Sequence, residues 1–133
     1  MLKKTLRILA LACLPLLFVA CGGSSDSTAS YAGHYTGNIA GDAGSTQNSG
    51  PMEFTVDSAG ALKGSATVNS FPVILVGTVD SAGVIKMQMW YGAVGDFAAM
   101  VMTGQVKSDN TFSGTQYENH KPEVTGTFAG KKD

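Results

Sequence analysis

Four methionines alternate along two apolar segments, and their sulfur atoms are the first candidates for chemistry. Met87 and Met89 are two residues apart, as are Met100 and Met102. Side chains two apart along a strand share a face, so all four can meet if the two segments pair. Thioethers are soft ligands that select Cu(I), and they also fill irregular cores or line adaptable apolar pockets. The pattern therefore allows a plain core, a pocket for a small apolar ligand, or a copper site.

The two histidines, His34 and His120, are the candidates for acid–base or metal chemistry. A catalytic site needs a nucleophile, a base and a group that orients the base. Neither histidine has a carboxylate at a spacing that predicts such a pair, and the serines fall in expected turns or on outward strand faces. Two histidines without cysteine are also too few ligands for a metal unless carboxylates converge in space. We therefore expect a protein that is not an enzyme and that has no metal site and no cofactor.

Both cysteines lie within the first 21 residues, in a segment with the layout of an export signal. A cationic head, Met1 to Arg7, precedes an apolar stretch from Ile8 to Ala20. That stretch is shorter than the roughly 20 residues of a membrane-spanning helix, and Pro15 interrupts it. Residues 1–20 are therefore expected to be a cleaved signal peptide.

The end of this signal, Leu17-Phe18-Val19-Ala20-Cys21, resembles the lipobox of bacterial lipoproteins. The resemblance implies cleavage before Cys21 and a diacylglycerol on its sulfur, and two or more acyl chains give stable anchoring. Cutting at Cys13 instead would leave an apolar tail from Leu14 to Ala20. The residue after this cysteine is Gly22 and not Asp, and in this respect the chain resembles lipoproteins of the outer membrane rather than of the inner membrane. We therefore expect a lipid-anchored protein of the cell envelope, at the outer membrane.

Composition changes after the signal. Residues 21–30 contain the expected lipidated cysteine followed by small polar residues with nothing to bury, which is typical of a flexible tether.

Without the signal peptide, the chain has six lysines, no arginine and ten acidic residues, so its net charge is −4. No basic patch remains to neutralise phosphates, which excludes nucleic acid as a partner.

Residues 31–133 are expected to form one all-β domain, because period-two alternation recurs between turn residues and no stretch has helical periodicity. A near-repeat marks the turns: Asp57-Ser58-Ala59-Gly60, Asp80-Ser81-Ala82-Gly83 and, more loosely, Lys107-Ser108-Asp109-Asn110. In such turns Asp accepts a hydrogen bond from the turn backbone, and Gly or Asn adopts a positive φ.

With these turns fixed, alternation predicts an eight-stranded antiparallel up-and-down barrel, a meander without exposed strand edges. The expected strands are 31–39, 51–56, 61–68, 71–79, 84–91, 97–106, 111–117 and 123–129. Val124 and Phe128 are among the expected interior positions. Strands 71–79 and 97–106 are apolar on both faces, which favours a covered side, a self-association face or a seam near the membrane.

Alternate connections of a meander lie at the same end. The three tight turns and the start of the first strand therefore share one end, beside the tether, and the opposite end should point away from the membrane. Loops on a rigid scaffold concentrate binding residues, and exposed Trp and Tyr are frequent anchors. The expected binding residues at that opposite end are Trp90, Tyr91, Asp96, Tyr117, Glu118 and His120. The alternative is that Trp90 or Tyr91 plugs the barrel mouth.

Two family resemblances extend beyond the lipobox. The polar tether and the glycine-punctuated ending from Gly126 to Lys132 resemble surface lipoproteins with C-terminal barrels, of the transferrin-binding protein B and factor H binding protein type. Ser113-Gly114-Thr115-Gln116-Tyr117 is similar to the SGxxY motif of membrane-bound lysozyme inhibitors. That resemblance implies that Ser113 inserts into the lysozyme cleft, although the chain lacks that family's cysteine pair.

The sequence thus supports three hypotheses. The first is a non-enzymatic, membrane-anchored lipoprotein, a binding or structural barrel whose outer loops contact a partner. The second is a carrier of a small apolar ligand inside the methionine-lined barrel, and the third is an inhibitor of a cell-wall hydrolase. The expected partners are the membrane, through the lipid anchor, and an unknown protein or small apolar ligand.

Overall fold

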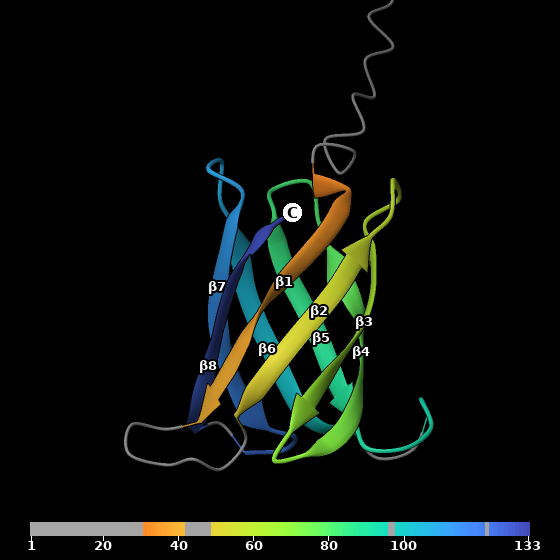
Figure 1. The fold of residues 1–133 in the computed structure, drawn as a ribbon, viewed down its shortest axis with the longest axis vertical. Helices are drawn as coiled ribbons and strands as arrows, with labels where there is room; N and C mark the ends of the chain where they lie inside the picture. Colours follow the sequence, from red (N-terminus) through yellow and green to blue (C-terminus); the bar gives the residue numbers. More distant parts are fainter. Residues whose placement is uncertain (1–30, 42–48, 96–97, 122) are drawn as a thin grey trace, which may run out of the picture.

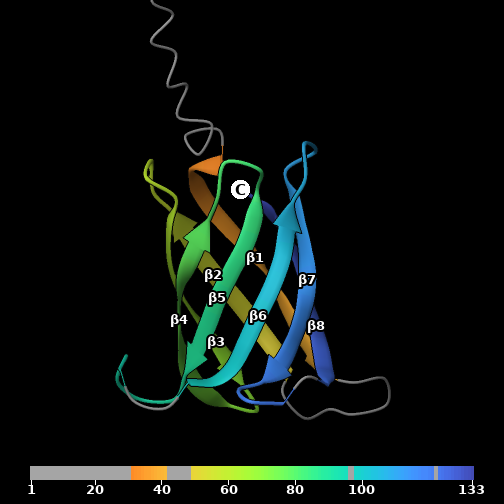
Figure 2. The same ribbon diagram turned by 180° about the vertical axis from the view of Figure 1, so that it is seen from behind.

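A computed structural model describes residues 31–41, 49–95, 98–121 and 123–133. Within them, eight strands form a closed antiparallel barrel in sequence order (Figures 1 and 2). The strands are β1 (Gly33–Gly41), β2 (Gly50–Val56), β3 (Ala61–Val68), β4 (Phe71–Val79), β5 (Val84–Trp90), β6 (Ala98–Val106), β7 (Thr111–Glu118) and β8 (Val124–Lys132). The predicted all-β up-and-down barrel is confirmed, and every strand begins and ends within about three residues of its expected limit.

Closure depends on the pairing of the first strand with the last. β1 pairs with β8 from Tyr35 opposite Lys132 to Gly41 opposite Gly126, and its other edge pairs with β2. Each of the eight strands therefore has a paired neighbour on both sides. Such a sheet has no open edge to which another chain could add a strand.

The first two repeated tetrapeptides form the predicted turns. Asp57 Oδ1 accepts hydrogen bonds from the backbone N–H groups of Ala59 and Ala61, both at 2.9 Å. The carboxylate of Asp80 accepts the same two bonds in the second turn. Gly60 and Gly83 have φ angles of 83° and 79°, a left-handed conformation that glycine adopts without a Cβ clash.

The third turn keeps this shape with different residues. Asn110, with a φ of 66°, takes the place of the glycine. The accepting carboxylate is now Asp109, which receives bonds from the hydroxyl of Thr111 at 2.6 Å and from its backbone N–H at 3.0 Å. Both bonds favour the charged carboxylate and so lower the pKa of Asp109.

The two ends of the barrel differ as predicted (Figure 1). The three tight turns and the start of β1 lie at one end, which we call the turn end. β1, β3, β5 and β7 finish at the opposite end, which we call the loop end.

Aromatic rings fill the turn-end half of the interior. Tyr35 and Phe54 stack with centroids 5.0 Å apart, while Phe112 meets Phe54 edge-on at 5.0 Å and lies 6.1 Å from Phe128. An interior glycine leaves the space that these rings need, since a Cβ on Gly37 would lie 2.8 Å from the Phe112 ring. All four rings are fully buried, so side chains fill this half of the barrel.

A β-bulge corrects one prediction near the loop end. Alternation places Val124 inside the barrel, but its side chain is 52% exposed. The register shifts between β7 and β8: Gln116 faces Gly126, whereas Tyr117 faces Val124, which leaves Thr125 without a partner in the ladder. An extra residue in one strand turns the residues beyond it to the other face. Val124 therefore lies on the outer wall beside Tyr117.

Phe112→Ala should lower the free energy of unfolding by about 3–5 kcal/mol, because it removes a fully buried ring from the aromatic cluster. The matched control is Phe71→Ala. That ring is largely exposed, so its loss should change the free energy by no more than about 0.5 kcal/mol. Urea unfolding measures both values. Equal losses in the two variants would contradict the assignment of Phe112 to the core.

Candidate binding surface at the loop end

Trp90 and Tyr91 form the first group of predicted binding residues. Trp90 ends β5 directly opposite Ile74 of β4, and Tyr91 follows with an exposed side chain. The preceding residue, Met89, is buried inside the barrel. Ile74, opposite Trp90 on β4, is 38% exposed, whereas Ala98, opposite Trp90 on β6 beyond a register shift, is buried. The Trp90 side chain is therefore half-buried at the loop end. Asp96, the next predicted residue, lies outside the described residues.

Tyr117, Glu118 and His120 form a second group, which β6 separates from the first. Tyr117 is half-buried on the outer wall opposite Val124. Glu118 forms an ion pair with Lys121, and its carbonyl accepts the Lys121 N–H at 3.0 Å. His120 lies within this turn with a φ of 70°, which is uncommon for a residue other than glycine. The structure thus does not join the predicted residues into one site.

Large apolar side chains are exposed only near the loop end, as far as the described ranges extend. They are Phe71 (65%), Val94 (53%), Val124 (52%), Tyr91 (42%) and Ile74 (38%). All of these except Val124 lie on β4 or in the loop after β5, on either side of the half-buried Trp90. We call this cluster the uncharged rim: Phe71, Ile74, Trp90, Tyr91 and Val94. The name reflects the absence of charged residues from 69–79 and 87–95.

Three members of the rim, Phe71, Ile74 and Val94, were not predicted as binding residues. The sequence does contain a signal for an exposed apolar surface, since strand 71–79 is apolar on both faces. One face of every strand in a closed barrel must meet solvent or a partner. The loop after β5 adds Gly92 and Gly95, where a Cβ would have no atom within 4 Å. Open space around both glycines indicates that this loop projects from the barrel.

The four methionines meet inside the barrel, where alternation placed them. Met87 lies opposite Met102, and Met89 opposite Met100. All four side chains are buried, and Met89 and Met102 have no surface that a water molecule can touch. A carrier would therefore have to move side chains aside to admit an apolar ligand.

Gln116 is the one buried polar side chain of the interior among the residues described. It lies opposite Met102 and Gly126, and a Cβ on Gly126 would collide with its amide. Neither its Oε1 nor its Nε2 has a hydrogen-bond partner. A buried polar group without a partner costs about 1–3 kcal/mol. Ser113, which the inhibitor resemblance assigns to a lysozyme cleft, lies in the same strand and pairs with Gln105 and Ala129.

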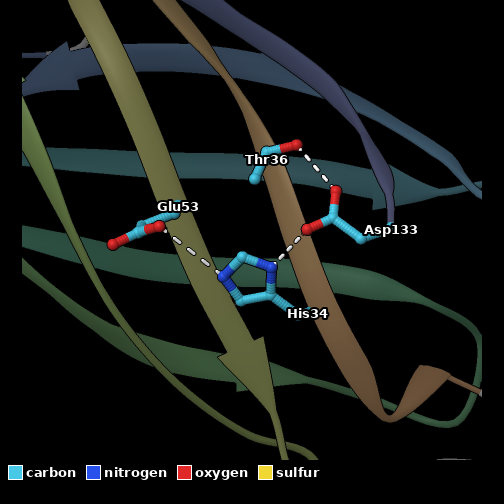
Figure 3. A network of polar contacts seen from close by, with 4 residues as sticks. All are labelled: His34, Thr36, Glu53 and Asp133. Atoms are coloured by element: carbon cyan, nitrogen blue, oxygen red, sulfur yellow. Dashed lines mark hydrogen bonds and ion pairs between the residues drawn. The ribbon is translucent and has the colours of Figure 1, made fainter.

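A polar network on the outer wall joins β1 to both of its neighbours (Figure 3). His34 Nδ1 contacts the Asp133 carboxylate, and Nε2 lies 3.6 Å from a Glu53 carboxylate oxygen. Thr36 donates its hydroxyl to the other Asp133 oxygen at 2.9 Å. The hydrogen bond from His34 and, second, that from Thr36 lower the pKa of the Asp133 carboxyl.

This network links β1 to β2 and to the residue after β8. Both imidazole nitrogens of His34 face carboxylates, and the Thr36 hydroxyl faces Asp133 and not the His34 ring. Asp133 is 99 positions from His34, which explains why sequence spacing did not predict the contact. A shallow outer depression of about 290 Å³ borders the network at Thr36 and Glu53.

A second depression of about 300 Å³ lies on the outer wall of β4 to β6 and includes Val76, Gln88 and Val101. Neither depression is lined by a residue of the uncharged rim. Across the described ranges, no three His, Cys, Asp or Glu side chains are grouped to hold a metal ion. The same ranges contain no helix of the length and apolarity needed to cross a membrane.

Comparison with known proteins gives no match: no protein-family model, no curated protein and no solved structure matches the chain.

Gln116→Met should raise the free energy of unfolding by about 1–3 kcal/mol, because it removes both unpartnered atoms and nearly conserves volume. Gln88→Met is the matched control on the exposed face of β5, with an expected change within about 0.5 kcal/mol. Urea unfolding compares the two. A loss of stability in Gln116→Met would mean that the amide is satisfied in solution, contrary to this prediction.

Proposed function

We propose that this protein is a lipid-anchored, non-enzymatic β-barrel lipoprotein of the bacterial cell envelope that binds a second envelope component through its loop end. The uncharged rim is the observation that carries this proposal. Four of its five large side chains are exposed and lie on β4 or in the loop after β5, beside the half-buried Trp90. The rest of the described outer wall exposes only Val124 among large apolar residues. Exposed apolar side chains that are grouped together and include aromatic residues often mark interaction sites in soluble domains.

The anchor rests on the lipobox resemblance at Cys21, which lies outside the described residues. Gly22 after this cysteine supports an outer-membrane address. β1 starts at the turn end, so the chain that precedes Tyr31 joins the barrel there (Figure 1). The attachment point and the uncharged rim are thus at opposite ends, and an anchored barrel keeps its rim available for binding.

Cys21→Ser should move the protein from the membrane fraction of its host to the soluble fraction or leave it as an uncut precursor, because no acyl chain can be attached. Cys13→Ser is the matched control, since it removes the other cysteine of the signal and should leave fractionation unchanged. Fractionation with intact-mass measurement distinguishes the outcomes. Normal maturation of Cys21→Ser would contradict the anchor.

A photo-crosslinking residue at Tyr91 should capture the envelope component in intact host cells, because this position lies in the exposed rim. The same residue at Lys63, exposed on the outer wall of β3, is the control and should capture little. Analysis of the crosslinked products reports whether the captured component is protein or lipid. Equal yields from both positions would contradict a specific role for the loop end.

A further inference from the structure

The chemistry of the uncharged rim narrows the class of its binding partner. The rim contains two aromatic side chains with polar atoms, the exposed Tyr91 and the half-buried Trp90, next to the purely apolar Phe71, Ile74 and Val94. Trp and Tyr are enriched where an apolar phase meets water, since one side of each ring is apolar and one end is polar. The absence of charged residues from 69–79 and 87–95 removes the groups most costly to place against acyl chains.

Size and shape argue against a stable protein interface at the rim. It spans two neighbouring strands about 5 Å apart, about 10 Å along β4 and one loop, which amounts to a few hundred Å² at most. A standard protein–protein interface needs roughly 800 Å² from each partner. The rim also lies outside both depressions and includes a projecting glycine-flanked loop. A few projecting apolar side chains can instead insert into a lipid surface, because the lipids move to accommodate them.

We propose that the uncharged rim docks on the surface of a lipid bilayer, with Phe71 and Val94 at the acyl boundary and Trp90 and Tyr91 at headgroup level. This inference rests on the proposed function, since it names the class of the envelope component. Because the rim carries no cation, apolar burial drives docking, and neutral phospholipid suffices. Docking gives the anchored chain a second contact with lipid.

The chain between the anchor and the barrel is long enough for this contact. Tyr31 lies ten positions after Cys21, and ten such steps span at most about 33–36 Å. The longest strands have nine residues, so they are about 30 Å long and, tilted by about 40°, rise about 23 Å along the barrel axis. The barrel can therefore tip over and bring its loop end to the membrane that holds Cys21.

The indole N–H of Trp90 favours contact with a lipid interface. Its indole Nε1 is buried and lacks a hydrogen-bond partner within the described structure. Lipid ester groups provide acceptors at the depth where an indole ring resides, so docking lets the ring turn outward and satisfy its N–H. Trp90 is also the only tryptophan of the chain, so all indole fluorescence reports on the rim.

The test uses the full chain purified from host membranes and reconstituted into phosphatidylcholine vesicles, with or without brominated phosphatidylcholine as a contact quencher. Docking predicts that Trp90 emission is quenched by brominated lipid and lies at shorter wavelength than in detergent. Raising the salt to about 1 M, where the Debye length is about 3 Å, should leave the quenching unchanged. Absence of quenching, or its loss in salt, would overturn docking by apolar burial.

The double variant Phe71→Ser/Val94→Ser should reduce the ratio of docked to undocked protein by about tenfold or more, because two exposed apolar side chains lose their burial in lipid. Val124→Ser is the matched control, since Val124 is equally exposed at the same end but outside the rim, and its quenching should match wild type. Far-UV circular dichroism confirms that each variant folds. Unchanged quenching in the double variant would overturn the assignment to the rim.

The crosslink from Tyr91 separates this inference from the proposed function. Capture of a discrete protein, together with no quenching by brominated lipid, would retain the loop end as the binding surface and remove lipid as its partner. If Tyr91 captures nothing and brominated lipid does not quench Trp90, both the proposed function and docking on lipid are overturned.

Discussion

The pairing of β1 with β8 is the constraint on which the rest of the structure depends. It closes the sheet, so each of the eight described strands has a neighbour on both sides and the barrel offers no edge for strand addition. Closure also divides the side chains into an inner and an outer set with period two. The proposed binding therefore uses outer side chains and loops, and the uncharged rim combines both.

Buried side chains fill the interior of the barrel. Four aromatic rings occupy the turn-end half, and methionines pair across β5 and β6 in the loop-end half. Gln116 is the exception, because its amide is buried among these side chains without a hydrogen-bond partner. On the outer wall, His34 bridges Asp133 and Glu53 and so ties β1 to β2 and to the residue after β8 (Figure 3).

Local signals made most of the fold predictable from the sequence. Asp57 and Asp80 cap turns whose glycines need a positive φ, and period-two alternation between such turns defines the strands. Alternation wrongly places Val124 inside the barrel, because a bulge depends on how two strands pair. The alternation within one strand does not encode that pairing. The His34–Asp133 contact joins residues 99 positions apart, and only closure brings them together.

The site was less predictable than the fold. Trp90 and Tyr91 are predictable because aromatic residues at strand ends are frequent binding residues. Ile74 joins them only through the register of β4 with β5, and Phe71 through its exposure on the same strand. The central claim is that an anchored chain binds through its outer rim and leaves its interior filled. Native mass spectrometry of the protein extracted from host membranes tests this claim most directly. The account predicts residues from Cys21 onward with acyl groups on that cysteine and no further small molecule, whereas a stoichiometric ligand released only on unfolding would contradict it.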